Sequence, residues 1–413
     1  MDLQHEENLR KYADLIVKVG LNIQPSQQLV VRAPLEAGPL VRAVAASAYR
    51  TGCRLVTVVW NDEQLQLLRL QNAPRDSFEE FPSWIMEGLV QCLKRGDAYL
   101  QVIGISPDLL KDQDPGSVTL VNRTFWRHYA PILDLQGENA INWCVVAAPI
   151  QGWAEMVFPG LDRRSAVSRL WDAIFETCRV NHPDPLVAWE SHLRRLEARC
   201  DYLNRKQYSC LKYNGPGTDL TVGLPRSHVW AGARLITKAG VPFVANLPTE
   251  EIFTSPHRNR VDGVAKATMP LSYAGTLIDG FSLTFAEGRV TAHSARTGEE
   301  VLKGLIQTDE GAARLGEVAL VPITSPICRS GILFYNTLFD ENASSHLAIG
   351  SAERTSISGG DSMSEEAFAE AGGNSSAIHI DFMIGSSELD VDGIDEGGLP
   401  EPVMHRGEWV FEV

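Results

Sequence analysis

The sequence predicts two domains: an N-terminal α/β domain with a Rossmann-like parallel sheet, and a mixed, mainly antiparallel, β-barrel-like C-terminal domain with helices. The chain has 413 residues, and roughly 150 residues per domain favours two or three domains. Strand-like and helix-like segments alternate in the first half, whereas short strands with Gly-containing turns follow one another closely after about residue 205. We therefore divide the chain into an α/β domain (1–200) and a second, mainly antiparallel domain (201–413).

The first domain begins with a strand–helix–strand pattern. Residues 7–19 carry apolar side chains at helical spacing, and residues 28–32 form a short apolar run between two prolines. An Ala-rich helix (37–51) and a β-branched strand (54–60) complete the pattern, which is typical of a parallel sheet. Further elements of both kinds follow: strands 98–104 and 141–147, and helices 114–129, 162–178 and 184–202.

The second domain shows turn signals at close intervals. Within residues 261–293, the pairs Asp262-Gly263, Asp279-Gly280 and Glu287-Gly288 predict turns between short strands. Residues 355–366 are small and polar and therefore predict a loop. This loop separates the two motifs with the strongest chemical character, so it is a candidate to lie over a site.

Composition excludes several classes of partner. The chain has 37 basic and 52 acidic residues, a net charge of −15, so it repels nucleic acid and anionic membrane surfaces. It contains no apolar run of about 18 residues and its first residues do not resemble a signal peptide. Seven cysteines without a CxxC pair predict reduced thiols. These observations favour a cytoplasmic protein.

Chemistry-bearing residues are concentrated in the C-terminal half. The N-terminal half has no GxGxxG or GxxxxGK[ST] motif, and neither HExxH nor GxSxG occurs anywhere. Potential metal ligands instead fall in four clusters, at 246–257, 315–321, 339–350 and 378–385.

The fourth cluster is the most informative. His379 and Asp381 stand two residues apart in an apolar, strand-like run, so both side chains point to the same face. An imidazole and a carboxylate that converge in this way suit a metal ion. The alternative is a surface strand with an ordinary polar face.

The other clusters add carboxylates and a second histidine. Glu317 lies in an otherwise apolar run, where a carboxylate is costly unless it is paired or ligated; the alternative is an edge strand facing water. Glu341 and His346 lie in a segment that we expect to run from a loop into a helix, where acidic residues also favour the helix dipole. Glu250 and Glu251 follow Pro-Thr, a sequence that is equally common where a turn or helix begins.

Together, two histidines and several carboxylates fit a site for two divalent ions. Such a nitrogen and oxygen donor set suits Zn²⁺, Co²⁺, Mn²⁺ or Mg²⁺ rather than copper or an iron–sulfur cluster. Two adjacent ions can activate water and polarise a carbonyl, which is the chemistry of amide hydrolysis.

The four clusters resemble the signature of the aminopeptidase T / aminopeptidase S family of metallopeptidases. The resemblance extends over essentially the whole chain and is strongest at 246–392, including Pro-Thr-Glu-Glu-Ile-Phe-Thr-Ser-Pro-His and His-Ile-Asp-Phe-Met-Ile-Gly. It implies an α/β domain, a barrel-like domain, a homodimer and a two-metal exopeptidase that removes N-terminal residues from peptides. By position, the resemblance implies six metal ligands, with Glu317 bridging both ions: Glu251, Glu317, Glu341, His346, His379 and Asp381.

One position departs from the family pattern. The family has a tyrosine seven residues after the His346 position, whereas this chain has Glu353, which we treat as a second catalytic candidate beside Glu317. A phenol donates a hydrogen bond to a developing oxyanion, and a carboxyl group does so only if its pKa is raised enough to keep it protonated. Alternatively, Glu353 ligates a metal or binds a cationic substrate amine, or Tyr335 or Tyr273 fills the role.

The leading function is therefore a metal-dependent aminopeptidase. The main alternative, motivated by Glu353, is a repurposed metal-dependent amide hydrolase with a specialised non-peptide substrate. A third is an iron-dependent ring-cleaving dioxygenase that would use His346, His379 and Asp381, although one iron leaves Glu251, Glu317 and Glu341 without a role. A metal-binding protein without catalysis is the fourth. Chelator-sensitive hydrolysis of aminoacyl amides separates the first from the others.

Overall fold

The computed structural model describes residues 3–273 and 276–413, and the chain divides into two units. The first unit comprises Met1–Ser191 and Arg234–Pro248, and the second comprises His192–Ala233 and Thr249–Val413. Helix α8 (Pro185–Lys206) contains the first of these boundaries. Residues 234–248 thus belong to the first unit, whereas the sequence places them in the second domain (201–413). The predicted division at residue 200 stays a prediction.

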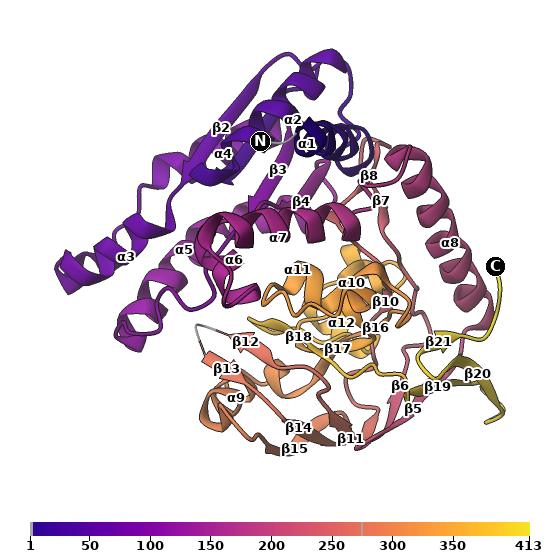
Figure 1. Ribbon diagram of the computed structural model, residues 1–413. Coiled ribbons are helices and arrows are strands. Elements are labelled where there is room, and N and C mark those ends of the chain that lie inside the picture. Colours follow the sequence, from indigo (N-terminus) through magenta and orange to yellow (C-terminus); the bar gives the residue numbers. More distant parts are fainter. Residues whose placement is uncertain (1–2, 274–275) are drawn as a thin grey trace. The chain divides into compact units, whose positions relative to one another are not determined.

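A parallel five-stranded sheet forms the centre of the first unit (Figure 1). Its strand order is β2-β1-β3-β4-β9, and each neighbouring pair is parallel. The Rossmann-like sheet is therefore confirmed. Its strands are β1 (Leu29–Pro34), β2 (Val56–Asn61), β3 (Ala98–Ile103), β4 (Trp143–Ala147) and β9 (Asn246–Leu247); β7 (Arg234–Ile236) and β8 (Pro242–Val244) form a separate antiparallel pair.

Helices alternate with these strands as expected. The predicted helix 7–19 is α1, which continues as a π-helical turn, Ile16–Gly20. Three helices, α3, α4 and α6, were not predicted, and α3 has no buried residue, which explains its weak apolar pattern. The helices are α1 (Leu3–Leu15), α2 (Gly38–Arg50), α3 (Glu63–Asn72), α4 (Ser83–Lys94), α5 (Pro115–Gly137), α6 (Gln151–Val157) and α7 (Arg163–Thr177), followed by α8.

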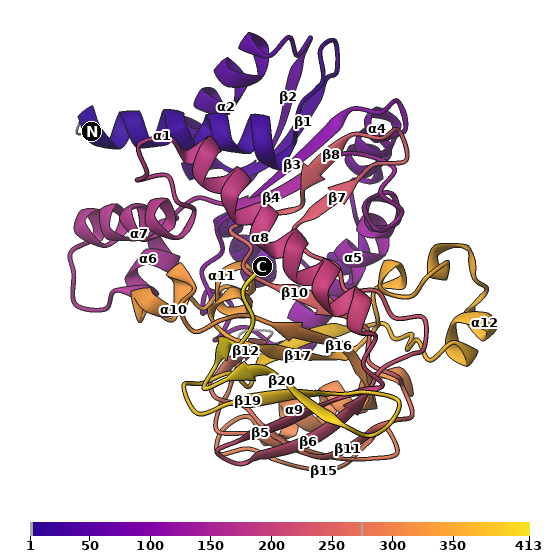
Figure 2. The same ribbon diagram turned by 90° about the vertical axis from the view of Figure 1, so that its right-hand side faces the viewer.

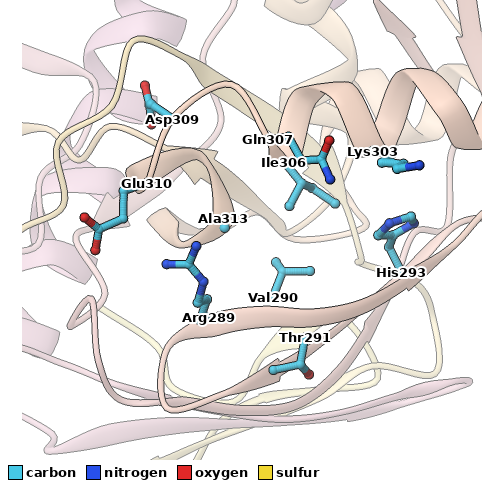
Figure 3. A pocket seen from close by; sticks show the side chains of 10 residues that line it. All are labelled: Arg289, Val290, Thr291, His293, Lys303, Ile306, Gln307, Asp309, Glu310 and Ala313. Carbon is cyan, nitrogen blue, oxygen red and sulfur yellow. The ribbon is translucent and has the colours of Figure 1, made fainter.

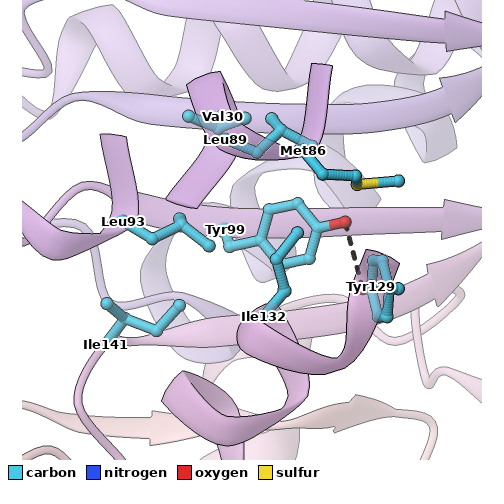
Figure 4. Packing of buried hydrophobic residues seen from close by; sticks show 8 residues of the cluster. All are labelled: Val30, Met86, Leu89, Leu93, Tyr99, Tyr129, Ile132 and Ile141. Carbon is cyan, nitrogen blue, oxygen red and sulfur yellow. Dashed lines mark hydrogen bonds between the residues drawn. The ribbon is translucent and has the colours of Figure 1, made fainter. Parts of the chain in front are cut away.

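Helices α4 and α5 pack on one face of the parallel sheet. Figure 4 shows Met86 and Leu89 of α4 beside Tyr99 of β3, whose hydroxyl lies 3.2 Å from that of Tyr129 on α5. Val30 of β1 belongs to the same cluster. Because side chains alternate along a strand, its neighbours on β1 face the other side of the sheet.

Two antiparallel sheets dominate the second unit (Figure 2). The larger follows the order β15-β14-β11-β6-β5-β19-β20-β21. The antiparallel prediction is confirmed, whereas closure into a barrel stays a prediction. The strands are β5 (Cys210–Gly215), β6 (Thr218–Gly223), β11 (Val261–Lys266), β14 (Ser282–Ala286), β15 (Arg289–Ser294), β19 (Asp390–Ile394), β20 (Pro400–His405) and β21 (Glu408–Trp409).

Two of the predicted turns illustrate the limits of dipeptide signals. Glu287-Gly288 does connect β14 to β15, and both residues have positive φ (49° and 78°), as in the tight turns of hairpins. The prediction of a turn at Asp262-Gly263 was wrong, because both residues lie inside β11. There the Asp262 carboxylate accepts a hydrogen bond from the backbone N–H of Glu287 at 2.8 Å.

The smaller sheet has the order β10-β16-β17-β18. Its strands are β10 (Ile252–Thr254), β16 (Leu315–Leu320), β17 (His346–Gly350) and β18 (His379–Met383); β12 (Leu271–Tyr273) and β13 (Thr276–Ile278) form a separate pair. Four short helices complete the unit: α9 (Glu299–Ile306), α10 (Pro326–Ser330), α11 (Thr337–Asp340) and α12 (Glu365–Glu370). Among the helices of the described residues, none has the length and apolar character needed to cross a membrane.

Candidate metal centre

The smaller sheet gathers the predicted ligands on one face. Glu317 on β16 lies opposite Ala348 on β17, and Ala348 lies opposite Asp381 on β18. Directly opposed residues of antiparallel strands project to the same face, so the two carboxylates stand on either side of a single methyl group. His379, two residues from Asp381, shares this face, as its spacing predicted.

A β-bulge places Glu317 in this row. The register of β16 against β17 shifts between Leu315 and Glu317, so Gly316 is the extra residue. A Cβ atom on Gly316 would collide with the carbonyl oxygens of Gly350 and Ser351. The Gly-Glu pair is therefore a structural unit: glycine permits the bulge, and the bulge directs the next side chain.

Four polar side chains converge on Glu317. One carboxylate oxygen of Glu317 lies 3.4 Å from His346 Nε2, and the other lies 3.7 Å from His379 Nε2. His346 Nε2 is also 3.1 Å from Glu251 Oε2, and His379 Nε2 is 3.2 Å from Asp381 Oδ1. Two ligand groups result, Glu251–Glu317–His346 and Glu317–His379–Asp381, each with its donor atoms within 4.8 Å of one another. Glu317 is common to both.

Backbone carbonyls orient the two imidazoles. His379 Nδ1 lies 2.7 Å from the carbonyl oxygen of Ser351, and His346 Nδ1 lies 3.2 Å from that of Ser344. A ring nitrogen that faces a carbonyl must carry the proton, which leaves Nε2 of the neutral ring free to bind a cation. Both Nε2 atoms point toward Glu317, so the neutral tautomers suit metal ligation.

The structure distinguishes the two adjacent glutamates. Among the described residues, Glu251 Oε2 is buried and accepts no hydrogen bond, as expected of an oxygen that would bind a metal ion. Glu250 instead lies 3.7 Å from His192, and its backbone N–H donates to Asn342 Oδ1 at 2.7 Å. The second glutamate, Glu251, therefore lies with Glu317 and His346, and its role as a metal ligand stays a prediction.

Glu341 approaches the cluster from a turn, not a helix. It begins a 3₁₀ turn, Glu341–Ala343, and His346 begins strand β17. The expectation that this segment runs from a loop into a helix was therefore wrong: helix α11 precedes Glu341, and Ser344 is extended. Asn342 Nδ2 lies 3.3 Å from Glu341 Oε1, so the same buried amide supports Glu341 and the backbone before Glu251.

The charge balance of the cluster calls for cations. Burial raises the pKa of the Glu317 and Glu341 carboxyl groups, and neighbouring carboxylates add to this. Burial opposes a charge on His379, but Asp381 and Glu317 outweigh it and raise its pKa to about 10. These shifts favour the protonated side chains when no cation is bound. Divalent cations would replace them, and the oxygen and nitrogen donors suit Zn²⁺, Co²⁺, Mn²⁺ or Mg²⁺.

Glu353 lies at the edge of this region. It follows Ala352 as the residue before a 3₁₀ turn, and its carbonyl oxygen accepts a hydrogen bond from Ser255 Oγ at 3.2 Å. Burial raises the pKa of its carboxyl group, whereas Thr355 and His379 oppose that rise. Of the two alternative tyrosines, Tyr335 lines a depression beside Asp381, and Tyr273 ends strand β12.

Sequence reasoning missed residues that act through the ligands. Ala348 was unremarkable in an apolar run, yet its small side chain separates Glu317 from Asp381. Asp340 stood in the quoted cluster without a role, and its buried carboxylate binds backbone N–H groups of the preceding loop. In the sequence, only its position next to the predicted ligand Glu341 indicated that Asp340 could have a structural role.

One hollow in the second unit lies away from these ligands. It encloses about 470 Å³ and is bordered by Arg289 and His293 of β15 and by Lys303 of α9 (Figure 3). None of the predicted site residues lines it. The depression that includes Asp381 is formed by other segments.

Comparison with known proteins identifies the family of this chain. The family model described as thermophilic metalloprotease (M29) matches residues 5–409. Aminopeptidase 2 of Geobacillus stearothermophilus is 46% identical over 408 residues, 99% of each chain, and aminopeptidase T of Thermus thermophilus is 45% identical, covering 98% of this chain and 99% of its own. The solved structure titled wild-type AmpT from Thermus thermophilus has a TM-score of 0.93, 45% identity and coverage of 98% and 99%. The resemblance deduced from the four clusters is confirmed, and the chain belongs to the thermophilic metalloprotease (M29) family.

Proposed function

We propose that this protein is a two-metal-dependent aminopeptidase that releases N-terminal residues from peptides. Its family and the names of its relatives support a metal-dependent hydrolase of this kind. The observation that carries the two-metal proposal is the position of Glu317, whose two oxygens face different histidines in two overlapping ligand groups.

Six side chains would hold the ions. Glu251 and His346 serve one position, and His379 and Asp381 serve the other. Glu317 would contribute to both positions, and Glu341 would supply a further carboxylate. Ions held in this way generate a nucleophile from water and polarise the scissile carbonyl. Because both oxygens of Glu317 face ion positions, another carboxylate of the site would accept the proton of the water and return it to the leaving amine.

We also propose a homodimer in the cytoplasm. The family resemblance supports the dimer. The seven cysteines are free thiols, four of them buried, and this supports a reducing compartment.

Hydrolysis of aminoacyl p-nitroanilides tests the proposed function. We expect turnover with Zn²⁺, Co²⁺, Mn²⁺ or Mg²⁺ and a loss of at least about 100-fold with chelator, because the nucleophile depends on the ions. Adding back the metal should restore the rate. Folded protein that remains inactive with every metal would sink the general aminopeptidase proposal and favour a specialised amide substrate.

For Glu353 we propose the role of a protonated hydrogen-bond donor to the developing oxyanion. Its raised pKa supports this role, because only the protonated carboxyl group donates. Activity that depends on the protonated form falls as the pH rises through this raised pKa. Glu353→Gln keeps an N–H donor that does not titrate, so we expect a rate within about fivefold of wild type and a weaker decline at high pH, whereas Glu353→Ala should lose roughly 10²-fold in kcat.

The pH profiles of kcat for wild type and both variants provide the measurement. If Gln and Ala are equally damaging, the carboxylate acts as a charge, as a metal ligand or as a site for the substrate ammonium. Metal content separates those two cases.

A further inference from the structure

We propose that His192 is a positioning residue of the metal centre, which holds the peptide group between Thr249 and Glu250 and thereby directs Glu251 toward the other ligands. This inference rests on the proposed function, in which Glu251 is a metal ligand, and it adds a residue to which that function assigns no role. His192 belongs to helix α8, and His192 and the peptide group both lie in the second unit.

Glu251 differs from most of the predicted ligands because no strand carries it. Four of the six lie within β16, β17 and β18, where the backbone hydrogen bonds of the sheet fix the chain. Residues 248–251 instead lie between β9 and β10 and belong to neither strand. The direction of the Glu251 side chain therefore depends on what holds the backbone just before it.

Two side chains hold the peptide group between Thr249 and Glu250 from opposite ends. His192 Nε2 lies 2.8 Å from the carbonyl oxygen of Thr249, and the N–H of Glu250 donates to Asn342 Oδ1 at 2.7 Å. A ring nitrogen that faces a carbonyl must carry a proton, so His192 Nε2 is the donor. Because the carbonyl and the N–H belong to one planar group, the two hydrogen bonds together define its orientation.

Burial makes this support hard to replace. His192, Thr249 and Asn342 are each at most 4% exposed. Without the imidazole N–H, the Thr249 carbonyl would lose a partner in surroundings that offer little water, which is costly for a buried acceptor. The peptide group would turn toward another donor, and the backbone that carries Glu251 would turn with it.

Asn342 connects this peptide group to the other predicted ligand that lies outside a strand. Its Nδ2 lies 3.3 Å from Glu341 Oε1 and donates to the carbonyl oxygen of Leu338 at 3.1 Å. The hydrogen bonds thus run from His192 through the peptide group to Asn342 and Glu341. Both ligands without a strand share one buried network, and His192 connects it to helix α8.

The same imidazole explains why two adjacent glutamates face different partners. His192 Nε2 lies 3.7 Å from Glu250 Oε2, which is too long for a hydrogen bond but close enough for an attraction between charges. Glu250 therefore faces α8, whereas Glu251 faces His346 at 3.1 Å. One residue thus holds the first glutamate away from the ligands and fixes the peptide group that leads to the second.

Metal titration of His192 variants tests this role. His192→Leu removes the donor, whereas His192→Gln keeps an N–H near the position of Nε2. In calorimetric titration of the metal-free protein with Zn²⁺, we expect His192→Leu to weaken one of the two ions roughly 10–100-fold, as is typical when a residue that orients a ligand is lost. The other ion should keep its affinity to within about threefold, and His192→Gln should restore the first to the same extent.

A double-mutant cycle assigns the effect to Glu251. Glu251→Gln removes the ligand that His192 directs, so adding His192→Leu should change the affinity less than about threefold. Added to Asp381→Asn, which alters the other ligand group, His192→Leu should keep its full effect. Tyr202→Phe is the control: it removes a hydrogen bond between the same helix and Glu401 and should leave both affinities unchanged.

The titration decides the role of His192 without a substrate. Equal weakening of both ions by His192→Leu, no rescue by His192→Gln, or full additivity with Glu251→Gln would overturn the inference. His192→Asn, whose shorter side chain does not reach the Thr249 carbonyl, replaces the leucine variant if that variant does not fold. If wild type binds both ions but hydrolyses no aminoacyl p-nitroanilide, the proposed function fails and the inference is judged separately. If wild type binds no ion, both fail.

Discussion

Glu317→Gln is expected to lower kcat for aminoacyl p-nitroanilides at least about 10³-fold, because it removes the carboxylate that is shared by both ligand groups and because the nucleophile depends on the ions. The glutamine side chain keeps the size of Glu317 but has only one oxygen acceptor, whereas the carboxylate faces His346 and His379 with one oxygen each. Metal content after dialysis should fall below two ions per chain. Steady-state kinetics and elemental analysis of the same sample provide both measurements.

Glu388→Gln is the matched control for this substitution. It removes one carboxylate from an exposed position in the same unit, so it changes the net charge equally without touching the ligand groups. We expect wild-type kinetics and full metal content. If Glu317→Gln retained two ions and a normal kcat, Glu317 would not be the ligand that the two ions share.

Much of the metal centre could be predicted from local spacing. The i, i+2 spacing of His379 and Asp381 determines that both face one side of a strand, whatever the rest of the fold. Glu317 was recognisable because a carboxylate in an apolar run needs a partner. The parallel sheet could also be predicted from local patterns, since β-branched runs alternate with helical segments along the chain.

The rest depended on pairings between distant segments. Nothing near Asn246 indicates that β9 joins the parallel sheet beside β4, because only the register reveals it. The same holds for Ala348, whose importance arises from its two opposite neighbours on other strands. His346 was misplaced because Asp340 and Glu341 resemble a helix N-terminus, whereas α11 has already ended there.

Glu353 shows a different limit. The family pattern identified the departure from tyrosine, but only the structure shows that burial favours the protonated form of this carboxyl group. The sequence alone could not decide between a charged and a neutral side chain, because the pKa depends on neighbours such as Thr355 and His379.

The second large effect is expected at Ala348. Its methyl group cannot bind a metal, but its small size leaves space between Glu317 and Asp381. Ala348→Leu would place a branched side chain between Glu317 and Asp381, in the row where the structure has one methyl group. We expect the loss of at least one ion and a fall in kcat of at least about 10³-fold, since the nucleophile depends on the ions. Metal analysis and kinetics measure both effects.

Folding must be separated from metal binding in this experiment. Overpacking a buried site costs about 1–3 kcal/mol, so the free energy of unfolding is compared in chelator, where wild type also lacks its ions. If the free energies of unfolding of wild type and Ala348→Leu differ only modestly in chelator, and the variant has lost metal, the loss results from the filled space between the carboxylates. Ala348→Gly is the control: it leaves that space open at a cost of about 0.5–1 kcal/mol and should retain both ions. Tight binding of two ions by the leucine variant would contradict the proposal. It would mean that the ions do not lie between Glu317 and Asp381, and that other carboxylates, such as Glu251 and Glu341, hold them.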